Sequence, residues 1–345
     1  MKAVTLSRHG GNEVLSFGDR PDPVPGRGEV LVRLEAAALN RLDVFVRNGI
    51  PGVPVSFPHV PGADGAGVVE AVGEGVARVK TGERVVLQPG LSCGTCELCL
   101  DGERSLCVDY RILGEHRAGT LAQRVVVPAV NVWPAPPGLS PEASAAFPLA
   151  AMTAWRMLVT RARLRAGETV LVHGVGGGVS VFAIQIARLC GASLVIATSG
   201  DPRKLDRAKE LGADEVLDYG KVDVGRAVRE ITRKRGVDVV VDSVGAATWR
   251  HSLTAAAKRG RIVTCGATTG PNPEEEIRVI FWKQLDILGS TMGNDAEFGA
   301  LLSAVSAGRV RPVVDEVFPL AEAVPAYERL EGGRGFGKVV LSIPA

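Results

Sequence analysis

The stretch TVLVHGVGGGVSVFAIQIARLCGA, residues 169–192, runs from an apolar strand pattern through a glycine-rich turn into a helix pattern. Apolar residues after the turn recur at the i, i+3, i+4 spacing of one helical face, at Val179, Phe182, Ala183, Ile186, Ala187 and Cys190. In this context glycines let the backbone approach a pyrophosphate, and the helix N-terminus offers it N–H groups. We therefore predict a dinucleotide site that includes Gly174, Gly176, Gly177, Gly178 and Val179. The alternative is a glycine-rich loop that binds no ligand.

The pattern on either side of this stretch divides the chain into two kinds of structure. Six apolar runs alternate with helix patterns, at 169–174, 193–199, 215–219, 237–245, 261–266 and 286–290. This alternation favours a bound dinucleotide and predicts an α/β fold with a doubly wound parallel sheet, the Rossmann arrangement. The N-terminal third has short strand patterns between Gly and Pro turns, at 29–39, 65–73, 83–90 and 122–129, which predict a β-barrel-like unit. A helix and a last strand after residue 292 are expected to complete that unit, so the predicted divisions are 1–152, 153–291 and 292–345.

Length and composition narrow the class of protein. The chain has 345 residues, a formal net charge of +2 and 46% hydrophobic residues, which suits two globular domains. A nearly neutral charge gives no electrostatic footprint for nucleic acid. No apolar run approaches the roughly 20 residues that span a bilayer, and the first residues lack the apolar core of a signal peptide. We expect a cytoplasmic protein with neither a nucleic-acid nor a membrane partner.

Four of the six cysteines lie within 15 residues, as Cys93-x2-Cys96-x2-Cys99-x7-Cys107. Such spacing predicts one structural zinc per chain, closed by four sulfurs with no position left for substrate. Disulfides are the competing interpretation, but a reducing compartment and the close spacing oppose them. Cys190 and Cys265 lie in apolar contexts, where cysteine usually acts as a small core residue.

The end of the second strand of the alternating region bears on the choice between NAD and NADP. An acidic residue there would bind the ribose 2′-hydroxyl, whereas this chain has Ser199, followed by Arg203 and Lys204. A hydroxyl and two cations suit a 2′-phosphate, so NADP is predicted over NAD. Against this, Asp201 lies beside the cations, which are alternatively solvated residues of a first helical turn.

The sequence resembles the medium-chain dehydrogenase/reductase superfamily of zinc alcohol dehydrogenases and quinone oxidoreductases over nearly its whole length. The similarity lies in PGADGAGVVEAVG (61–73), the cysteine segment, the glycine turn, KLDRAKELGADEVLDY (204–219) and GFGKVVL (335–341). The resemblance implies a GroES-like catalytic domain with a Rossmann domain, in a homodimer or homotetramer. It also implies that Thr153 lies near the nicotinamide, that Lys338 contacts the pyrophosphate and that Tyr219 lines the adenosine pocket.

The sequence departs from the zinc alcohol dehydrogenases at the positions of a second, catalytic zinc. Asn40 stands where the first ligand, a cysteine, is expected, and the Gly-His-Glu motif is replaced by Gly62-Ala63-Asp64. The segment 147–153 offers neither Cys nor Asp as a third ligand, and Leu42 replaces the hydroxyl of the proton relay. A catalytic zinc needs three protein ligands, so none is expected here. His59, His116 and Asp64 are the residues from which such a site could be rebuilt.

These departures favour a reductase of quinones or α,β-unsaturated carbonyls that uses no catalytic metal. The spacing of Asn40 and Asp43 resembles the quinone oxidoreductases, whereas the cysteine segment is typical of the alcohol dehydrogenases. We expect the Asn40 amide to donate to the substrate oxygen, although Asn40 is alternatively a helix-capping residue. Asp64 is expected either to orient this site or to pair with a cation. The alternatives are a zinc-containing alcohol or aldehyde dehydrogenase and a non-enzymatic NADPH-binding protein.

Overall fold

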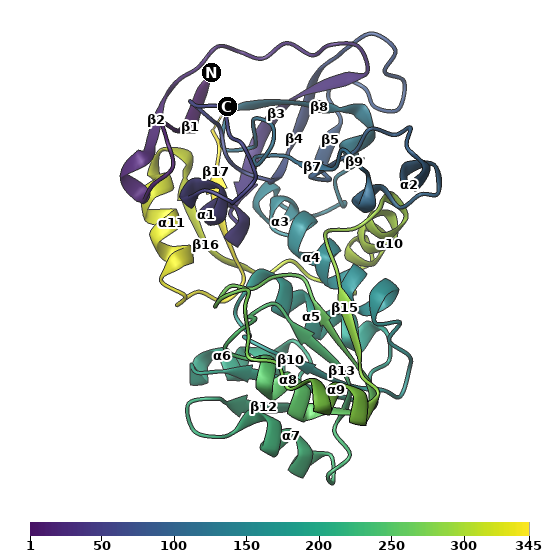
Figure 1. Cartoon of the computed structure of the whole chain (residues 1–345). Coiled ribbons are helices and arrows are strands. Elements are labelled where there is room, and N and C mark those ends of the chain that lie inside the picture. The colour runs from purple at the N-terminus through teal and green to yellow at the C-terminus, as the bar shows by residue number, and fades with distance from the viewer. Residues whose placement is uncertain (345) are drawn as a thin grey trace. The chain divides into compact units, whose positions relative to one another are not determined.

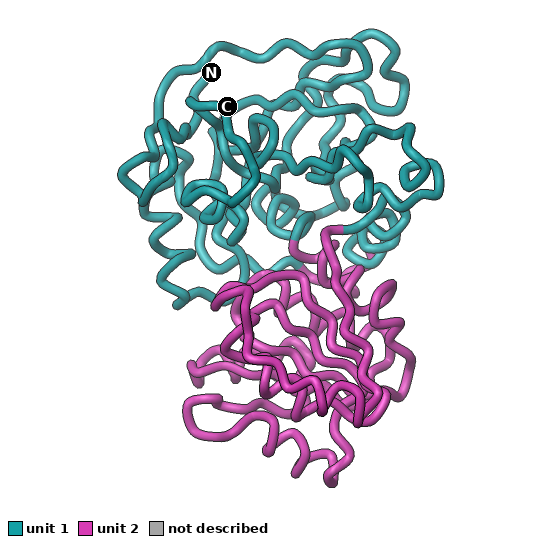
Figure 2. The backbone as a smooth tube through the Cα atoms, viewed as in Figure 1, with its two compact units in different colours: residues 1–149, 293–306, 312–345 teal, residues 150–292, 307–311 magenta. Residues whose placement is uncertain are grey.

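A computed structural model describes residues 1–344 and divides them into two compact units. Unit 1 comprises residues 1–149, 293–306 and 312–344, and unit 2 comprises residues 150–292 and 307–311 (Figure 2). The first boundary thus falls at 149/150, three residues before the division expected from the sequence. The return of 307–311 to unit 2 was not predicted, because this short segment carries no strand or helix pattern of its own.

Unit 2 contains a parallel sheet whose strands, within the described residues, follow the order β12-β11-β10-β13-β14-β15. The strands are β10 (Thr169–Val172), β11 (Leu194–Ser199), β12 (Glu215–Asp218), β13 (Val237–Asp242), β14 (Ala256–Thr264) and β15 (Asp286–Gly289) (Figure 1). The helices are α5 (Gly178–Leu189), α6 (Pro202–Glu210), α7 (Val224–Ile231), α8 (Trp249–Ala255) and α9 (Ile277–Lys283). The strand order reverses at β10, as in a doubly wound fold. The predicted Rossmann arrangement is confirmed.

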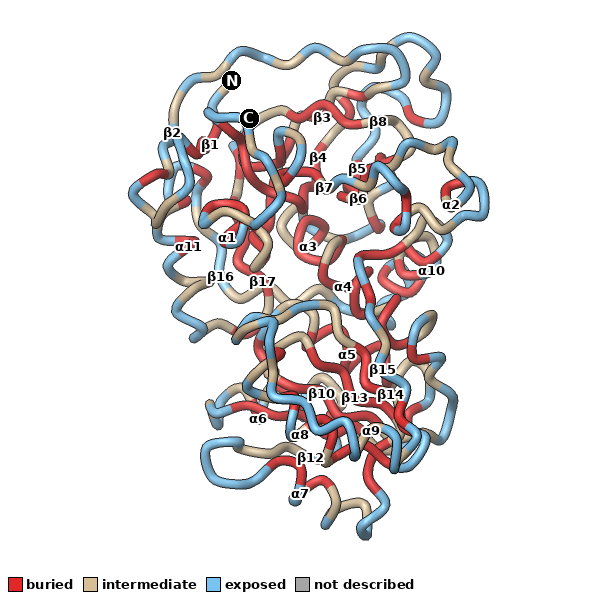
Figure 3. The backbone as a smooth tube through the Cα atoms, viewed as in Figure 1, coloured by how far each residue is buried: buried red, intermediate tan, exposed pale blue. Residues whose placement is uncertain are grey.

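The central strands of unit 2 are apolar because helices cover both faces of a parallel sheet. Val170, Leu171 and Val172 in β10 are fully buried, and Figure 3 shows β10 and β13 mostly in the colour of buried residues. The helix starts are fixed by local chemistry. Asp201 accepts a hydrogen bond from the Arg203 N–H at the start of α6, and Pro202 occupies the first helical position.

Unit 1 is built on a sheet whose order, for the part of the chain described, is β16-β17-β3-β4-β5-β9, with β8 also pairing β3. The strands are β3 (Glu29–Ala38), β4 (Asp64–Val72), β5 (Arg84–Leu87), β8 (Arg124–Pro128), β9 (Val132–Pro134), β16 (Val314–Pro319) and β17 (Lys338–Ser342). One edge of β3 pairs with β4, while its other edge pairs first with β8 and then with β17. The last strand of the chain therefore completes this unit. The sheet of unit 1 agrees with the predicted GroES-like fold.

The remaining elements of unit 1 surround this sheet. Two-stranded sheets are formed by β1 (Lys2–Leu6) with β2 (Leu15–Asp19) and by β6 (Gly90–Leu91) with β7 (Arg111–Ile112). The helices are α1 (Arg41–Asn48), α2 (Glu97–Leu100), α3 (Pro141–Ala145), α10 (Asp295–Ser306) and α11 (Ala323–Glu331). α4 (Pro148–Trp155) begins in unit 1 and continues into unit 2. Among residues 1–344, no helix has the length and apolar character needed to cross a membrane.

Candidate functional site

Four polar residues from distant parts of unit 1 form a group that we name the buried cluster: Asn40, Asp43, Asp64 and Lys338. Asn40 directly precedes α1, Asp43 lies in its first turn, Asp64 begins β4 and Lys338 begins β17. Antiparallel pairing in the sheet brings these positions together, because Ala38 of β3 pairs with Asp64 on one side and with Val340 on the other. The four residues are between 0% and 6% exposed.

Asp64 is the centre of the buried cluster. Its Oδ2 accepts hydrogen bonds from Asn40 Nδ2 and from Lys338 Nζ, each at 2.9 Å. Its Oδ1 accepts from the backbone N–H of Leu149 at 2.8 Å. The Asp64 carboxylate thus pairs with a cation, which is one of the two alternatives for this residue, and it also binds the Asn40 amide.

Asn40 is held by protein groups on both its side chain and its backbone. Its Nδ2 donates to Asp64 and, at 3.4 Å, to the Ala38 carbonyl, while its Oδ1 accepts from Lys338 Nζ. Its backbone N–H donates to Asp43 Oδ2 at 2.7 Å, so Asn40 is the N-cap residue of α1. The backbone contact is the one that the capping alternative expects, while donation from the Asn40 amide to a substrate stays a prediction.

The Lys338 ammonium, whose contact with a pyrophosphate stays a prediction, has two protein acceptors. The ammonium donates to Asp64 and to Asn40. In the zinc alcohol dehydrogenases that the sequence resembles, these two positions hold zinc ligands or their immediate neighbours. The ion pair is 3% exposed on the lysine side and 0% on the aspartate side. A desolvated pair of this kind depends on full hydrogen bonding, and Asp64 receives it from three donors.

Asp43 is a functional candidate to which the sequence analysis assigned no role. Burial, offset in part by the N–H of Asn40 and the charge of Lys338, raises the pKa of its carboxyl to about 7. Tyr327 of α11 is fully buried nearby, and its hydroxyl has no hydrogen-bond partner among the described residues. Burial and the charge of Asp43 raise the pKa of Tyr327 well above its ordinary value.

The histidines considered for a rebuilt metal site do not join Asp64. His59 is buried, its Nε2 bonds to the Gly114 carbonyl at 2.9 Å, and burial lowers its pKa. His116 Nδ1 accepts from the Ile112 N–H at 3.1 Å. Within residues 1–344, the cysteines are the one group of three or more His, Cys, Asp or Glu side chains arranged to hold a metal ion.

The predicted nucleotide loop in unit 2 connects β10 to α5. Gly174 has a φ of +65° and Gly176 a φ of +123°, values that strongly favour glycine. Gly177 is the N-cap of α5, so Gly178 and Val179 present the free N–H groups of its first turn. Ser180, which replaces a closing glycine, donates to the Gly174 and Gly177 carbonyls at 3.0 and 2.9 Å and so fixes the turn.

The residues predicted for the adenosine end lie at the carboxyl ends of β11 and β12. Ser199 ends β11, and its Oγ accepts from the Asp201 N–H at 3.2 Å. The Arg203 guanidinium pairs with Asp201 at 3.0 Å, and Lys204 follows it in the first turn of α6. The ring of Tyr219 packs so closely on Gly200 that a Cβ there would lie 2.8 Å from it. Thr153 lies in the part of α4 that belongs to unit 2, and it is buried.

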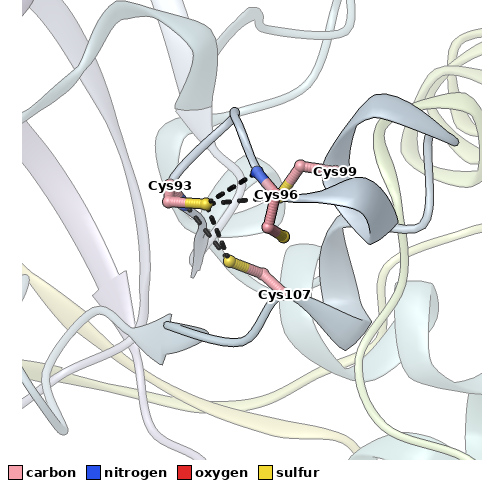
Figure 4. Close-up of side chains that lie close together, drawn as sticks. All are labelled: Cys93, Cys96, Cys99 and Cys107. Atoms are coloured by element: carbon pink, nitrogen blue, oxygen red, sulfur yellow. Dashed lines mark hydrogen bonds between the residues drawn. The ribbon is translucent and has the colours of Figure 1, made fainter.

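The four cysteines of unit 1 converge on one point (Figure 4). Their sulfurs all lie within 4.8 Å of one another, with 3.9 Å between Cys93 and Cys99 and 3.5 Å between Cys93 and Cys107. Sulfurs bound tetrahedrally at 2.3 Å from zinc would be about 3.8 Å apart. All six cysteines of the chain are free thiols, so no disulfide competes for them.

Backbone groups around the cysteines favour thiolates. The N–H groups of Thr95 and Cys96 point at the Cys93 sulfur and lower its pKa to about 6. Burial raises the pKa of Cys99 to about 11, which a bound cation would oppose. The donor set, the distances and the closed geometry therefore fit one structural zinc ion.

Two family models match most of the chain. Residues 26–137 match the alcohol dehydrogenase GroES-like domain, and residues 178–307 match the zinc-binding dehydrogenase domain. The chain belongs to the medium-chain dehydrogenase/reductase superfamily. This confirms the resemblance seen in the sequence and makes the protein an NAD(P)-dependent oxidoreductase with a cysteine site for structural zinc.

Similar proteins of this superfamily carry different activity names. A zinc-type alcohol dehydrogenase-like protein of Schizosaccharomyces pombe is 36% identical, over 92% of this chain and 91% of its own. The quinone oxidoreductase of Pseudomonas aeruginosa is 34% identical, over 99% of both chains. A crystal structure of an NAD-dependent alcohol dehydrogenase is 50% identical with a TM-score of 0.96, over 100% of both chains. Membership of the superfamily alone therefore does not select the substrate of this dehydrogenase.

Proposed function

We propose that this dehydrogenase reduces quinones or α,β-unsaturated carbonyls with NADPH, and that its zinc is structural only. The observation that carries the proposal is the Lys338 ammonium, which binds both Asn40 and Asp64 in the buried cluster. A metal ion at these two positions would have to displace that cation. Such an ion would also have fewer than the three protein ligands that it needs. Asn40 is a poor replacement for the expected cysteine, and Ala63 is a poor replacement for the expected histidine.

The substrate class follows from what an ammonium can and cannot do. A zinc ion lowers the pKa of a bound alcohol by direct coordination, which alcohol oxidation requires near neutral pH. An ammonium supplies positive charge without coordination, so it suits substrates that spread negative charge by conjugation. When bound, the nicotinamide supplies the hydride. In this proposal the Lys338 ammonium, the positive end of the ion pair with Asp64, faces the substrate oxygen in a desolvated site. Asp64 and Asn40 hold the ammonium there, and water returns the proton.

A second candidate function is NAD(P)-dependent alcohol or aldehyde oxidation. It is favoured by the 50% identical crystal structure, which is named as an NAD-dependent alcohol dehydrogenase. Under this alternative a second metal ion binds despite Lys338. Inertness toward simple primary and secondary alcohols at pH 7–9 separates the two functions.

For the nucleotide we infer a preference for NADP. Ser199 offers a hydroxyl where a carboxylate would repel a 2′-phosphate, and Arg203 and Lys204 follow in the first turn of α6. The pairing of Arg203 with Asp201 opposes this preference, but Arg203 is 83% exposed and such surface pairs are weak. We propose that the guanidinium leaves Asp201 for the phosphate.

We also propose that the protein forms a homodimer through the edge of unit 2. β15 ends the sheet, and α9 beside it exposes Ile277, Phe281 and Trp282 by 67%, 62% and 76%. A sheet edge and neighbouring apolar side chains suit a two-fold contact between identical copies. Light scattering of the wild-type protein and of Trp282→Glu tests this proposal, and a monomeric wild type would contradict it.

The central test combines metal content with a substrate panel. Protein purified without added metal is first analysed for zinc. It is then assayed with NADPH and either a benzoquinone or a cyclic enone, and separately with NADP and primary alcohols. We expect about one zinc per chain, turnover of quinone or enone, and no turnover of alcohols. Two zinc ions per chain, with alcohol oxidation lost as the second is chelated, would make the alcohol dehydrogenase the better assignment.

A further inference from the structure

Asp43 is the one member of the buried cluster whose side chain does not bind Lys338 or Asp64 directly. It is 1% exposed, and its Oδ2 accepts the backbone N–H of Asn40 at 2.7 Å. The N–H of Gly62, two residues before Asp64, opposes the effect of burial on the pKa of this carboxyl. Asp43 therefore binds the backbone of Asn40 and lies close enough to Asp64 and Lys338 to interact with their charges.

The consequence of this contact runs through Asn40. The backbone of Asn40 is extended, with φ −126° and ψ 161°, and the Asp43 carboxylate fixes it at the start of α1. The same residue directs one amide atom at Asp64 and the other at Lys338. A rotation of this backbone would move both amide atoms, and the Lys338 ammonium would lose one of its two protein acceptors.

We propose that Asp43 is a positioning residue of the proposed active site, which holds the Lys338 ammonium in place through Asn40. The inference rests on the proposed function for its effect on catalysis. It is independent of that function for its effect on the position of Lys338.

The charges around Asp43 give this role a pH signature. Asp43 interacts with the charges of Lys338 on β17 and Asp64 on β4 and with Tyr327 on α11. Arg47, of the same helix as Asp43, lies over the Tyr327 ring. Below pH 7 Asp43 is protonated and neutral, so the charges of Asp64 and Lys338 cancel. Above pH 7 an ionised Asp43 adds a second negative charge to the buried cluster. Because hydride addition builds negative charge on the substrate, the rate is expected to fall as pH rises through about 7.

The test compares Asp43→Ala, Asp43→Asn and the control Asp19→Asn, which removes an exposed carboxylate of unit 1. We expect Asp43→Ala to lower kcat about tenfold or more with little change in the KM for NADPH. Asp43→Asn keeps an acceptor for the Asn40 N–H, so it should lose less activity and lose the decline above pH 7. Asp19→Asn should keep both the rate and the pH profile of the wild type.

A second readout does not require turnover. Acylation of lysines, followed by mass spectrometry, reports the accessibility of Lys338, with the exposed Lys221 as internal reference. We expect Asp43→Ala to increase the labelling of Lys338 several-fold relative to Lys221, and Asp43→Asn to increase it less. Unchanged labelling, or a pH profile that Asp43→Asn leaves intact, would overturn the proposal. A wild type that reduces no quinone or enone, yet shows the labelling change, would instead overturn the proposed function alone.

Discussion

Lys338 Nζ lies 2.9 Å from Asp64 Oδ2 in a pair that is 3% exposed on one side and 0% on the other. Both charges are removed from water, and each makes a further hydrogen bond. Lys338 donates to Asn40, and Asp64 accepts from the Leu149 N–H. Buried ion pairs seldom add net stability over apolar residues of the same shape, so a functional reason for this pair is the stronger explanation. The energetic cost of disturbing it is still large, because removing one partner leaves the other charge buried and unpaired.

The first prediction concerns that unpaired charge. Lys338→Met leaves the Asp64 carboxylate without its cation, and we expect the free energy of unfolding at pH 8 to fall by about 3–5 kcal/mol. Urea denaturation measures the change. The double variant Asp64→Asn with Lys338→Met should recover a large part of the loss, whereas additive losses would show that the two side chains are not coupled.

The second prediction concerns the cysteine site. Cys107→Ser should lower the zinc content from about one ion per chain to near zero, because a structural site needs all four ligands. We expect the segment 93–107 to become sensitive to limited proteolysis, since the bound ion replaces a hydrophobic core in holding this loop. Cys190→Ser, outside the cluster, is the matched control and should keep the zinc. Retention of a full zinc equivalent by Cys107→Ser would contradict the four-sulfur assignment.

Sequence reasoning worked best where the signal is local. The strands of unit 2 are continuous apolar runs, the turn after β10 needs glycines at positive φ, and the cysteines lie close enough in sequence to share one ion. Each of these features depends on neighbours within about 25 residues, so pattern and spacing were enough to predict them. β16 was not predicted, because its burial is only partial and its pairing partner β17 lies farther along the chain.

The buried cluster could not be predicted in the same way. Asp64 and Lys338 are 274 residues apart, and nothing in the local sequence of either indicates the other. The direction of the Asn40 amide depends on three partners that the fold brings together. The family pattern identified Asn40, Asp64 and Lys338 as important positions, but their mutual contacts required the structure.

The third prediction concerns the nucleotide. Arg203→Ala should raise the KM for NADPH about tenfold, because one charge-assisted hydrogen bond to the 2′-phosphate is lost. The KM for NADH should change little, because NADH has no 2′-phosphate. Steady-state kinetics with both nucleotides measure the ratio. Arg226→Ala, which removes an exposed arginine of α7, serves as the control. Equal changes for NADPH and NADH would mean that Arg203 does not contact a 2′-phosphate.

The fourth prediction is a pH dependence of stability that originates in Asp43. Its pKa is raised from 3.8 to about 7 by burial, so the folded protein holds a proton that the unfolded chain releases above pH 4. The stability that this group contributes is therefore present at low pH and is lost as pH rises toward 7. Between pH 5 and pH 8 the wild type should lose about 2–3 kcal/mol relative to Asp43→Asn, whose side chain does not titrate. Urea denaturation of both proteins at pH 5 and pH 8 measures the difference between their free energies of unfolding. If this difference is the same at both pH values, or shifts in favour of the wild type at pH 8, Asp43 is ionised in the folded protein well below pH 7.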